Sequence, residues 1–216
     1  MTPSPSGHER PPTERRLTLD DISDLRAYER ERDERRARVI AVKSLRRVGV
    51  GPLVSVVFEN RETVRHQVQE MVRAERLVSD AQVQIELDTY NPLIPLPGEL
   101  SATVFIELTD EALLREWLPK LVGIERHFEL RLDAGPGDPE TAVDIVVGEP
   151  DAVHEELLTR SDVTSTVHYM RFRLHGAQLA RFDAGPVWLA CTHPEYREHT
   201  RLSEETKDEL RSDLVD

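Results

Sequence analysis

The chain has almost no sulfur chemistry. Its single cysteine, Cys191, excludes a disulfide, a cysteine-ligated Fe–S cluster or a zinc knuckle formed within one chain. In the strand predicted around it, Cys191 shares a face with Val187 and Leu189, which is typical of a buried, unreactive thiol. We therefore expect no redox centre built from the chain's own cysteine.

Long apolar runs and nucleotide motifs are also absent. No run approaches the ~18 apolar residues that a membrane-spanning helix needs, and the N-terminus lacks the apolar region of a signal peptide. Gly-x-Gly-x-x-Gly, P-loop, Gly-x-Ser-x-Gly and His-Glu-x-x-His sequences do not occur, so the common nucleotide-binding and hydrolase classes lack support. We expect a cytoplasmic protein without a cofactor.

Aromatic residues make up only 5% of the sequence, while charged residues make up 32% and give a net charge of −13. This charge argues against binding to nucleic acid or to anionic lipid. The charges are uneven: residues 30–47 hold eight basic and three acidic side chains, and residues 133–162 hold nine acidic and one basic. Either these are two solvated faces, or the basic stretch contacts an acidic partner.

The first part of the chain is predicted to be a tail followed by helices. Residues 1–16 are rich in Pro and Ser and are expected to be disordered. A long helix is expected to begin within 17–21, capped by Thr18 or Asp20, and its ion-paired middle can stand in water. This helix is either simply exposed or an arm that grips a partner or a second copy of the chain.

The stretch 58–78 predicts an amphipathic core helix that begins at Asn60, a good N-cap. Five aliphatic residues fall on one side of it: Val64, Val68, Met71, Val72 and Val78. A strand precedes it at 53–58 after a turn at 49–52. A shorter helix follows, capped by Ser79 or Asp80, and three prolines predict a stiff loop over 90–98.

The second half predicts mixed elements with hairpin-like spacing. Strands are expected at 100–108, 127–132, 142–147, 166–174 and 187–192, and helices at 110–118, 150–158, 178–182 and 203–214. We therefore predict an α+β fold with a largely antiparallel sheet, on which the long N-terminal helix and the central helix pack. Residues 17–216 are expected to form one domain, with a helical layer and one strand in 17–98 and mixed elements in 99–216.

Arg61 and Glu75 point into the apolar stripe of the central helix. A charge in such a place is unfavourable unless it is paired, so both are expected to be substantially buried with partners. One interpretation is a structural salt bridge. The other is a polar pocket beneath the sheet, with Tyr90 and His168, in which Arg61 meets an anionic group. His168 lies on the core side of its strand, which is more typical of a core histidine.

Glu62, His66 and Glu70 lie four residues apart on the polar face of the same helix. Carboxylate, imidazole and carboxylate together could face a hard metal ion. A single helix, however, supplies neither a closed coordination shell nor the Glu-x-x-His pairs of di-iron bundles. We therefore predict no metal site.

Three stretches carry a resemblance: VGPLVSVVFENRETVRHQVQEMVRAER, YNPLIPLPGELSATVFIEL, and VHYMRFRL with HPEY. Together they resemble a bacterial family catalogued as domain of unknown function 3501, from about residue 17 to the last helix. The resemblance implies no established activity, and gene neighbours that encode rubrerythrin-like proteins and a heterodisulfide-reductase-like Fe–S protein. Family-typical stretches contain Arg61, Gln69, Glu70, Arg73, Glu75, Tyr90, Asn91 and Pro92.

Two functions follow as hypotheses. The first is a non-catalytic accessory protein of a redox or peroxide-stress system, with the arginine-rich first helix and the outward face of the central helix as contact surfaces. Its partner would be a rubrerythrin-like or Fe–S protein, as the resemblance implies. The second is an enzyme or small-ligand binder with a pocket around Arg61, Glu75, Tyr90 and His168.

Overall fold

The computed structural model describes residues 15–135, 137–151 and 162–215. All strand pairings within these residues are antiparallel, which confirms the predicted α+β fold, but the strands form two sheets. Two expectations lie outside the described residues: the disordered tail, except for Arg15 and Arg16, and almost all of the helix at 150–158.

The larger sheet, sheet A, has five strands and the smaller, sheet B, has four. In spatial order sheet A consists of β1 (Arg47–Val50), β2 (Val54–Glu59), β3 (Glu99–Ile106), β7 (Val167–Arg173) and β6 (Glu149–Pro150). Sheet B consists of β5 (Asp144–Val147), β4 (Phe128–Leu132), β8 (Val187–His193) and β9 (Tyr196–Arg201). Strands β1, β6 and β9 were not predicted. Residues 17–98 thus hold two strands, because Gly49 and Val50 pair with β2 instead of forming the turn.

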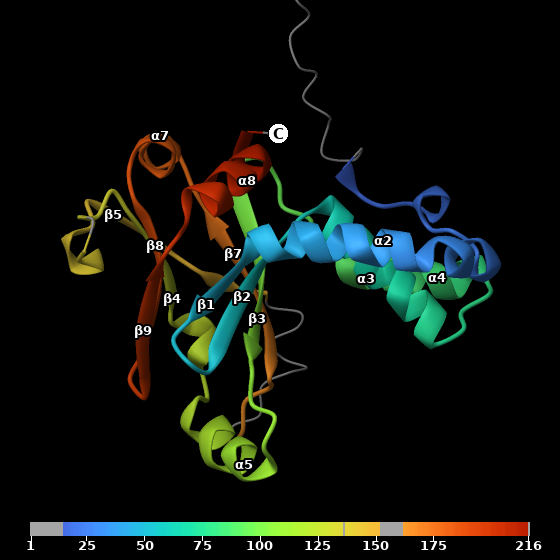
Figure 1. Cartoon of the computed structure of the whole chain (residues 1–216), viewed down its shortest axis with the longest axis horizontal. Helices are drawn as coiled ribbons and strands as arrows, with labels where there is room; N and C mark the ends of the chain where they lie inside the picture. The colour runs from blue at the N-terminus through green and yellow to red at the C-terminus, as the bar shows by residue number, and fades with distance from the viewer. Residues whose placement is uncertain (1–14, 136, 152–161, 216) are drawn as a thin grey trace, which may run out of the picture.

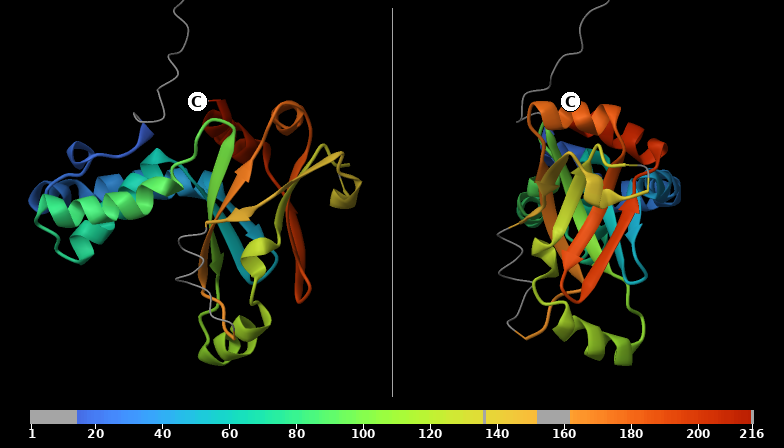
Figure 2. Two further views of the ribbon diagram at one scale, coloured as in Figure 1. Left: turned by 180° about the vertical axis from the view of Figure 1, so that it is seen from behind. Right: turned by 90° about the vertical axis from the view of Figure 1, so that its left-hand side faces the viewer.

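The main core lies between the two sheets. Alternate residues of β2, Val54, Val56 and Phe58, are buried there, as period-two alternation requires. Leu210 of α8 (Glu204–Val215) and Phe182 of α7 (Ala177–Ala184) belong to the same core at one end. Helix α5 (Glu111–Lys120) lies at the opposite end (Figures 1 and 2).

Cys191 belongs to this core with 2% of its surface exposed, as predicted. Burial raises the pKa of its thiol to about 11, so the sulfur stays protonated near neutral pH.

Three helices extend to one side of sheet A: α2 (Leu25–Arg46), α3 (Arg61–Ala74) and α4 (Asp80–Tyr90) (Figure 1). The short helix η2 (Asn91–Leu93) leads from α4 toward β3. A second, smaller core lies in this layer and consists of Leu17, Val64, Val68, Val72, Leu87, Leu93 and Ile94. Among the described residues, no helix is both long and apolar enough to cross a bilayer.

The helix starts show local capping. Asn60 caps α3 as predicted: its side-chain Oδ1 accepts a hydrogen bond from the Thr63 backbone N–H, and its own backbone N–H donates to Thr63 Oγ1. The predicted start of the first helix is wrong. Thr18 caps only a short turn, η1 (Leu19–Asp21), and α2 begins at Leu25 because the Asp24 carboxylate accepts hydrogen bonds from the first free backbone N–H groups.

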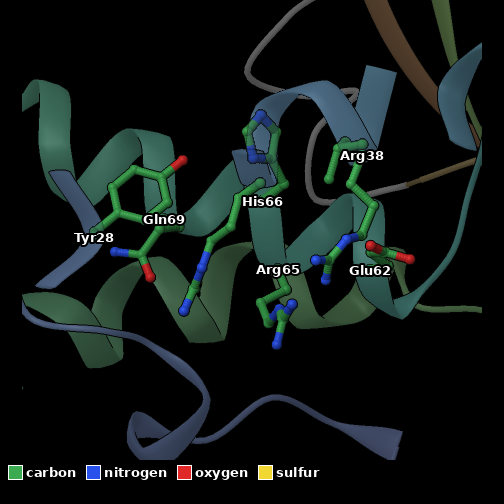
Figure 3. Close-up of a pocket in the computed structure, with 8 residues that line it drawn as sticks. Tyr28, Arg38, Glu62, Arg65, His66 and Gln69 are labelled. Atoms are coloured by element: carbon green, nitrogen blue, oxygen red, sulfur yellow. The ribbon is translucent and has the colours of Figure 1, made fainter. Parts of the chain in front are cut away.

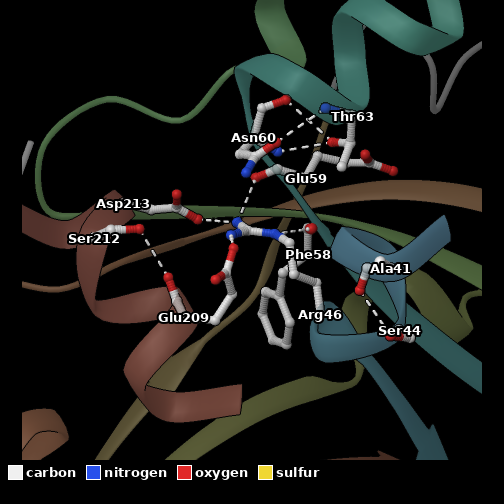
Figure 4. Close-up of polar contacts among 10 residues, drawn as sticks. All are labelled: Ala41, Ser44, Arg46, Phe58, Glu59, Asn60, Thr63, Glu209, Ser212 and Asp213. Atoms are coloured by element: carbon white, nitrogen blue, oxygen red, sulfur yellow. Dashed lines mark hydrogen bonds and ion pairs between the residues drawn. The ribbon is translucent and has the colours of Figure 1, made fainter. Parts of the chain in front are cut away.

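One buried arginine joins three elements. Arg46, at the end of α2, is fully buried and donates to the Phe58 carbonyl at 2.8 Å. It also pairs with Glu209 at 3.0 Å and with Asp213, both on α8 (Figure 4). Arg46 therefore fixes α2 and α8 against the end of β2.

Candidate functional site

Two of the predicted site residues hold the N-terminal segment through its backbone. The Asn91 amide accepts from Leu17 N at 2.7 Å and donates to Leu17 O at 2.9 Å. The Gln69 amide does the same with Ser23, at 2.9 and 3.0 Å. Both side chains are buried and both are used within the fold.

Three charged residues of α3 hold the following part of the chain. Arg61 pairs with Asp21 at 2.6 Å, and Arg73 pairs with Glu29 at 3.0 Å. Glu70 accepts two hydrogen bonds from Arg32 at 2.9 Å and one from the Tyr28 hydroxyl at 2.6 Å. The face of α3 that was expected to meet a partner is thus covered in part by α2.

The Arg32 guanidinium is the main reason that the pKa of Glu70 falls to about 2, and the Tyr28 hydroxyl lowers it further. Glu70 is therefore ionised and paired across the physiological pH range.

The predicted pocket around Arg61, Glu75, Tyr90 and His168 does not form. Glu75 is exposed, because α3 ends at Ala74 and Glu75 is its C-cap residue. Arg61 is paired as expected, but its side chain is one-third exposed. His168 and Tyr169 are neighbours on β7 and point to opposite faces of sheet A, so only Tyr169 can approach Tyr90.

His168 is a core histidine, as its strand position indicated. It is 2% exposed, and its Nε2 lies 3.0 Å from Thr164 Oγ1 and 2.9 Å from the Ser165 carbonyl. Its Nδ1 lies 3.8 Å from Glu125, which is also buried. The His168–Glu125 pair lies on the face of sheet A that points away from α2, α3 and α4.

Glu62, His66 and Glu70 lie on the polar face of α3. The Glu70 carboxylate already accepts hydrogen bonds from Arg32 and Tyr28 and would have to give them up to bind a metal ion. Within the described ranges, no group of three or more His, Cys, Asp or Glu side chains is placed to hold a metal ion.

A basic hollow lies between α2 and α3, and we call it the arginine groove. Its volume is about 20 Å³, and it is lined by Tyr28, Arg35, Arg38, Val39, Glu62, Arg65, His66 and Gln69. Figure 3 shows Tyr28 and Gln69 at one end, Arg38 and Glu62 at the other, and His66 and Arg65 between them. Three arginines and one carboxylate make the groove locally positive.

Burial and cations outside the groove lining lower the pKa of His66. Its pKa is lowered first by burial, and then by the neighbouring charges of Lys43, Arg32 and Arg36, against an opposite effect of Glu70. The imidazole is therefore kept neutral near pH 7.

A larger hollow, which we call the sheet cleft, lies between the helices and the outer face of sheet A. Its volume is about 160 Å³. It is lined by Lys43 of α2, Val64 and Gln67 of α3, Tyr90, Leu93, Glu59 of β2, Thr103 and Phe105 of β3, and Val167 and Tyr169 of β7.

Glu59 is the most deeply placed charged group of the sheet cleft. Only 6% of it is exposed, and its Oε1 accepts a hydrogen bond from Thr103 at 2.7 Å. Burial raises the pKa of Tyr169 to about 12, with further contributions from Tyr90 and Glu59, so its hydroxyl stays protonated.

Sequence reasoning missed Glu59 and Lys43 and found only Tyr90 among the residues of the cleft. A signal was present in β2, where Ser55 and Glu59 alternate with Val54, Val56 and Phe58. The valine-rich run at 53–58 predicts a strand but does not show that Ser55 and Glu59 share one polar face of it.

No curated protein matches this chain. The chain is similar to a solved structure from Burkholderia pseudomallei K96243, described as a novel protein of unknown function, with 35% identity and a TM-score of 0.81. That match covers 93% of this chain and 99% of the other. The family model described as "Protein of unknown function (DUF3501)" matches residues 16–214. The chain therefore belongs to the DUF3501 family.

Proposed function

We propose that this protein is a non-catalytic accessory protein that docks an acidic partner protein on the arginine groove. The observation that supports this most is the convergence of Arg35, Arg38 and Arg65 on a chain with a net charge of −13. On a protein with a negative net charge, a basic surface favours both the approach and the orientation of an acidic partner.

The groove suits carboxylates in particular. Arg65 forms no ion pair with any residue that the structure describes, and its guanidinium can bind a carboxylate through two parallel hydrogen bonds. Within the described residues, Arg35 and Arg38 form ion pairs only with Glu31 and Glu34 on their own helix. Such pairs contribute a few tenths of a kcal/mol and exchange readily for the carboxylates of a partner.

The resemblance to the family supports a redox partner, namely a rubrerythrin-like or Fe–S protein with an acidic face. In this proposal electron transfer belongs to the partner. The state of Cys191 supports placing electron transfer on the partner, because this thiol is buried and its pKa is raised.

The test uses the purified rubrerythrin-like and Fe–S proteins of the same organism in calorimetric titrations. We expect one of them to bind, and binding to weaken as salt is raised. We expect the triple variant Arg35→Ala, Arg38→Ala, Arg65→Ala to lose roughly 1–3 kcal/mol of binding free energy, which weakens binding about 5- to 150-fold. Arg115→Ala on α5, whose arginine pairs only with Glu111 in the described part of the chain, is the matched control and binds as the wild type does.

His66 provides a second readout. A partner carboxylate placed in the groove adds negative charge beside the imidazole, so the pKa of His66, followed by NMR, is expected to rise on binding. Equal affinities of the triple variant and the wild type would exclude the groove as the docking site. Failure of both redox proteins to bind at low salt would exclude the proposed function.

A further inference from the structure

The sheet cleft contains two charged side chains that have no counter-ion in the described part of the chain. Among the residues that the structure describes, neither the Glu59 carboxylate nor the Lys43 ammonium forms an ion pair. Figure 4 shows the Glu59 carboxylate directed away from the Arg46 guanidinium. Arg46 donates to the backbone carbonyl of Glu59 and not to its carboxylate. A carboxylate that is 6% exposed and lacks a cation is unfavourable, so the cleft favours a ligand that supplies one.

The two charges come from opposite walls of the cleft. Glu59 lies on β2 in the floor formed by sheet A, and Lys43 lies on α2 in the helical layer. They form no ion pair with each other, and both line the same hollow of about 160 Å³. A ligand with an ammonium and a carboxylate would satisfy both walls at once.

The remaining walls are apolar and aromatic. Phe105 and Val167 form part of the floor beside the rings of Tyr90 and Tyr169, with Leu93 nearby. Aromatic faces also attract an ammonium group. Gln67 hydrogen-bonds to the Tyr90 hydroxyl, which holds one of these rings in place.

We propose that the sheet cleft binds a small zwitterion of the α-amino acid class with an apolar side chain. Glu59 receives the ammonium, Lys43 receives the carboxylate, and the apolar walls receive the side chain. The cleft volume of about 160 Å³ limits the size of the ligand. An engineered apolar cavity of about 150 Å³ holds benzene, so the cleft suits a ligand of about six to nine non-hydrogen atoms.

This proposal does not depend on the arginine groove and is tested separately. The full-length protein is titrated with valine, with isobutylamine, which lacks the carboxylate, and with isovalerate, which lacks the ammonium. Thermal shift and calorimetry both measure binding. We expect valine to bind at least ten times more tightly than either half of the molecule, because each half leaves one charge of the cleft unpaired.

Variants test whether Glu59 and Lys43 each bind one charged group of the ligand. Glu59→Gln and Lys43→Met keep the approximate shapes, and each is expected to weaken valine binding at least tenfold. Glu116→Gln and Lys120→Met, which alter an exposed pair on α5, are the matched controls and should bind as the wild type does. If Glu59→Gln fails to fold, Thr103→Val removes the hydroxyl that holds the Glu59 carboxylate and is expected to weaken binding in the same direction.

Two results would overturn the proposal. One is the absence of valine binding to the wild type at millimolar concentration. The other is binding of isobutylamine as tight as that of valine, which would leave Lys43 without a role.

Discussion

The Glu70 carboxylate receives three hydrogen bonds from α2, and its pKa falls from 4.5 to about 2. Because the folded state binds this proton less readily than the unfolded state does, the contribution to stability is complete above about pH 4.5. It is lost as the pH falls toward 2.

Glu70→Gln is therefore expected to lower the free energy of unfolding at pH 7 by roughly 2 kcal/mol, after allowance for the 26% exposure of the side chain. Urea unfolding at pH 7, 4 and 2.5 measures this. The difference from the wild type should shrink steadily toward pH 2.5. Glu31→Gln, which alters an exposed pair on α2, is the control and should change stability by less than about 0.5 kcal/mol. A difference that is independent of pH would show that Glu70 acts through packing instead of charge.

At the scale of elements, Arg46 determines how α2 and α8 meet. Arg46→Ala would leave Asp213, which is 9% exposed, without its guanidinium. We expect a loss of roughly 3–5 kcal/mol in the free energy of unfolding, measured with urea. Arg38→Ala on the exposed side of α2 is the control and should cost less than about 1 kcal/mol.

The double variant Arg46→Met, Asp213→Leu tests whether the unpaired Asp213 carboxylate causes this loss of stability. It replaces the two charges with apolar groups and should recover a large part of the loss. A double variant as unstable as Arg46→Ala would mean that the backbone carbonyls bound by Arg46 matter more than its partner carboxylates.

Element starts could be predicted from sequence where capping is local. Asn60 caps α3 as predicted, Ser79 is one of the two caps predicted for α4, and Asp110 caps the helix expected to begin there. In each case the cap contacts backbone groups only two or three residues away. The end of α3 could not be predicted. Arg76 adopts a left-handed conformation, with φ of 54°, where glycine is the usual signal. That turn places Glu75 outside the helix.

The partners of the candidate site residues lay beyond the reach of sequence patterns. Gln69 meets Ser23, and Asn91 meets Leu17, which are separated by 46 and 74 residues. A helical wheel shows which side of α3 is polar but not which segment covers that side. The same reason hid the sheet cleft, whose walls come from α2, α3, α4, η2 and three strands.

At the scale of the whole molecule, the two cores differ in size. The core between the sheets includes residues from both sheets, α7 and α8, whereas seven buried residues form the core of the helical layer. Polar contacts supply much of the remaining attachment of that layer. Regions with fewer buried apolar contacts open at a lower free energy.

Hydrogen exchange followed by mass spectrometry is expected to show this difference. Amides of α4 around Leu87 should exchange at least ten times faster than amides of β3 around Val104, although both residues are fully buried. Equal protection of the two regions would show that the helical layer and the sheets open as one cooperative unit.

Gln69 and Asn91 bind the N-terminal segment much as one strand pairs with another. Each side-chain amide accepts a hydrogen bond from one backbone N–H and donates one to the carbonyl of the same residue. At Ser23 any residue except proline can meet that requirement, because proline alone lacks the N–H group. What this contact constrains is a distance along the chain: the two anchored positions are six residues apart. Evolution can therefore exchange the side chain at Ser23 freely, while inserting or deleting one residue between the anchors displaces one of them.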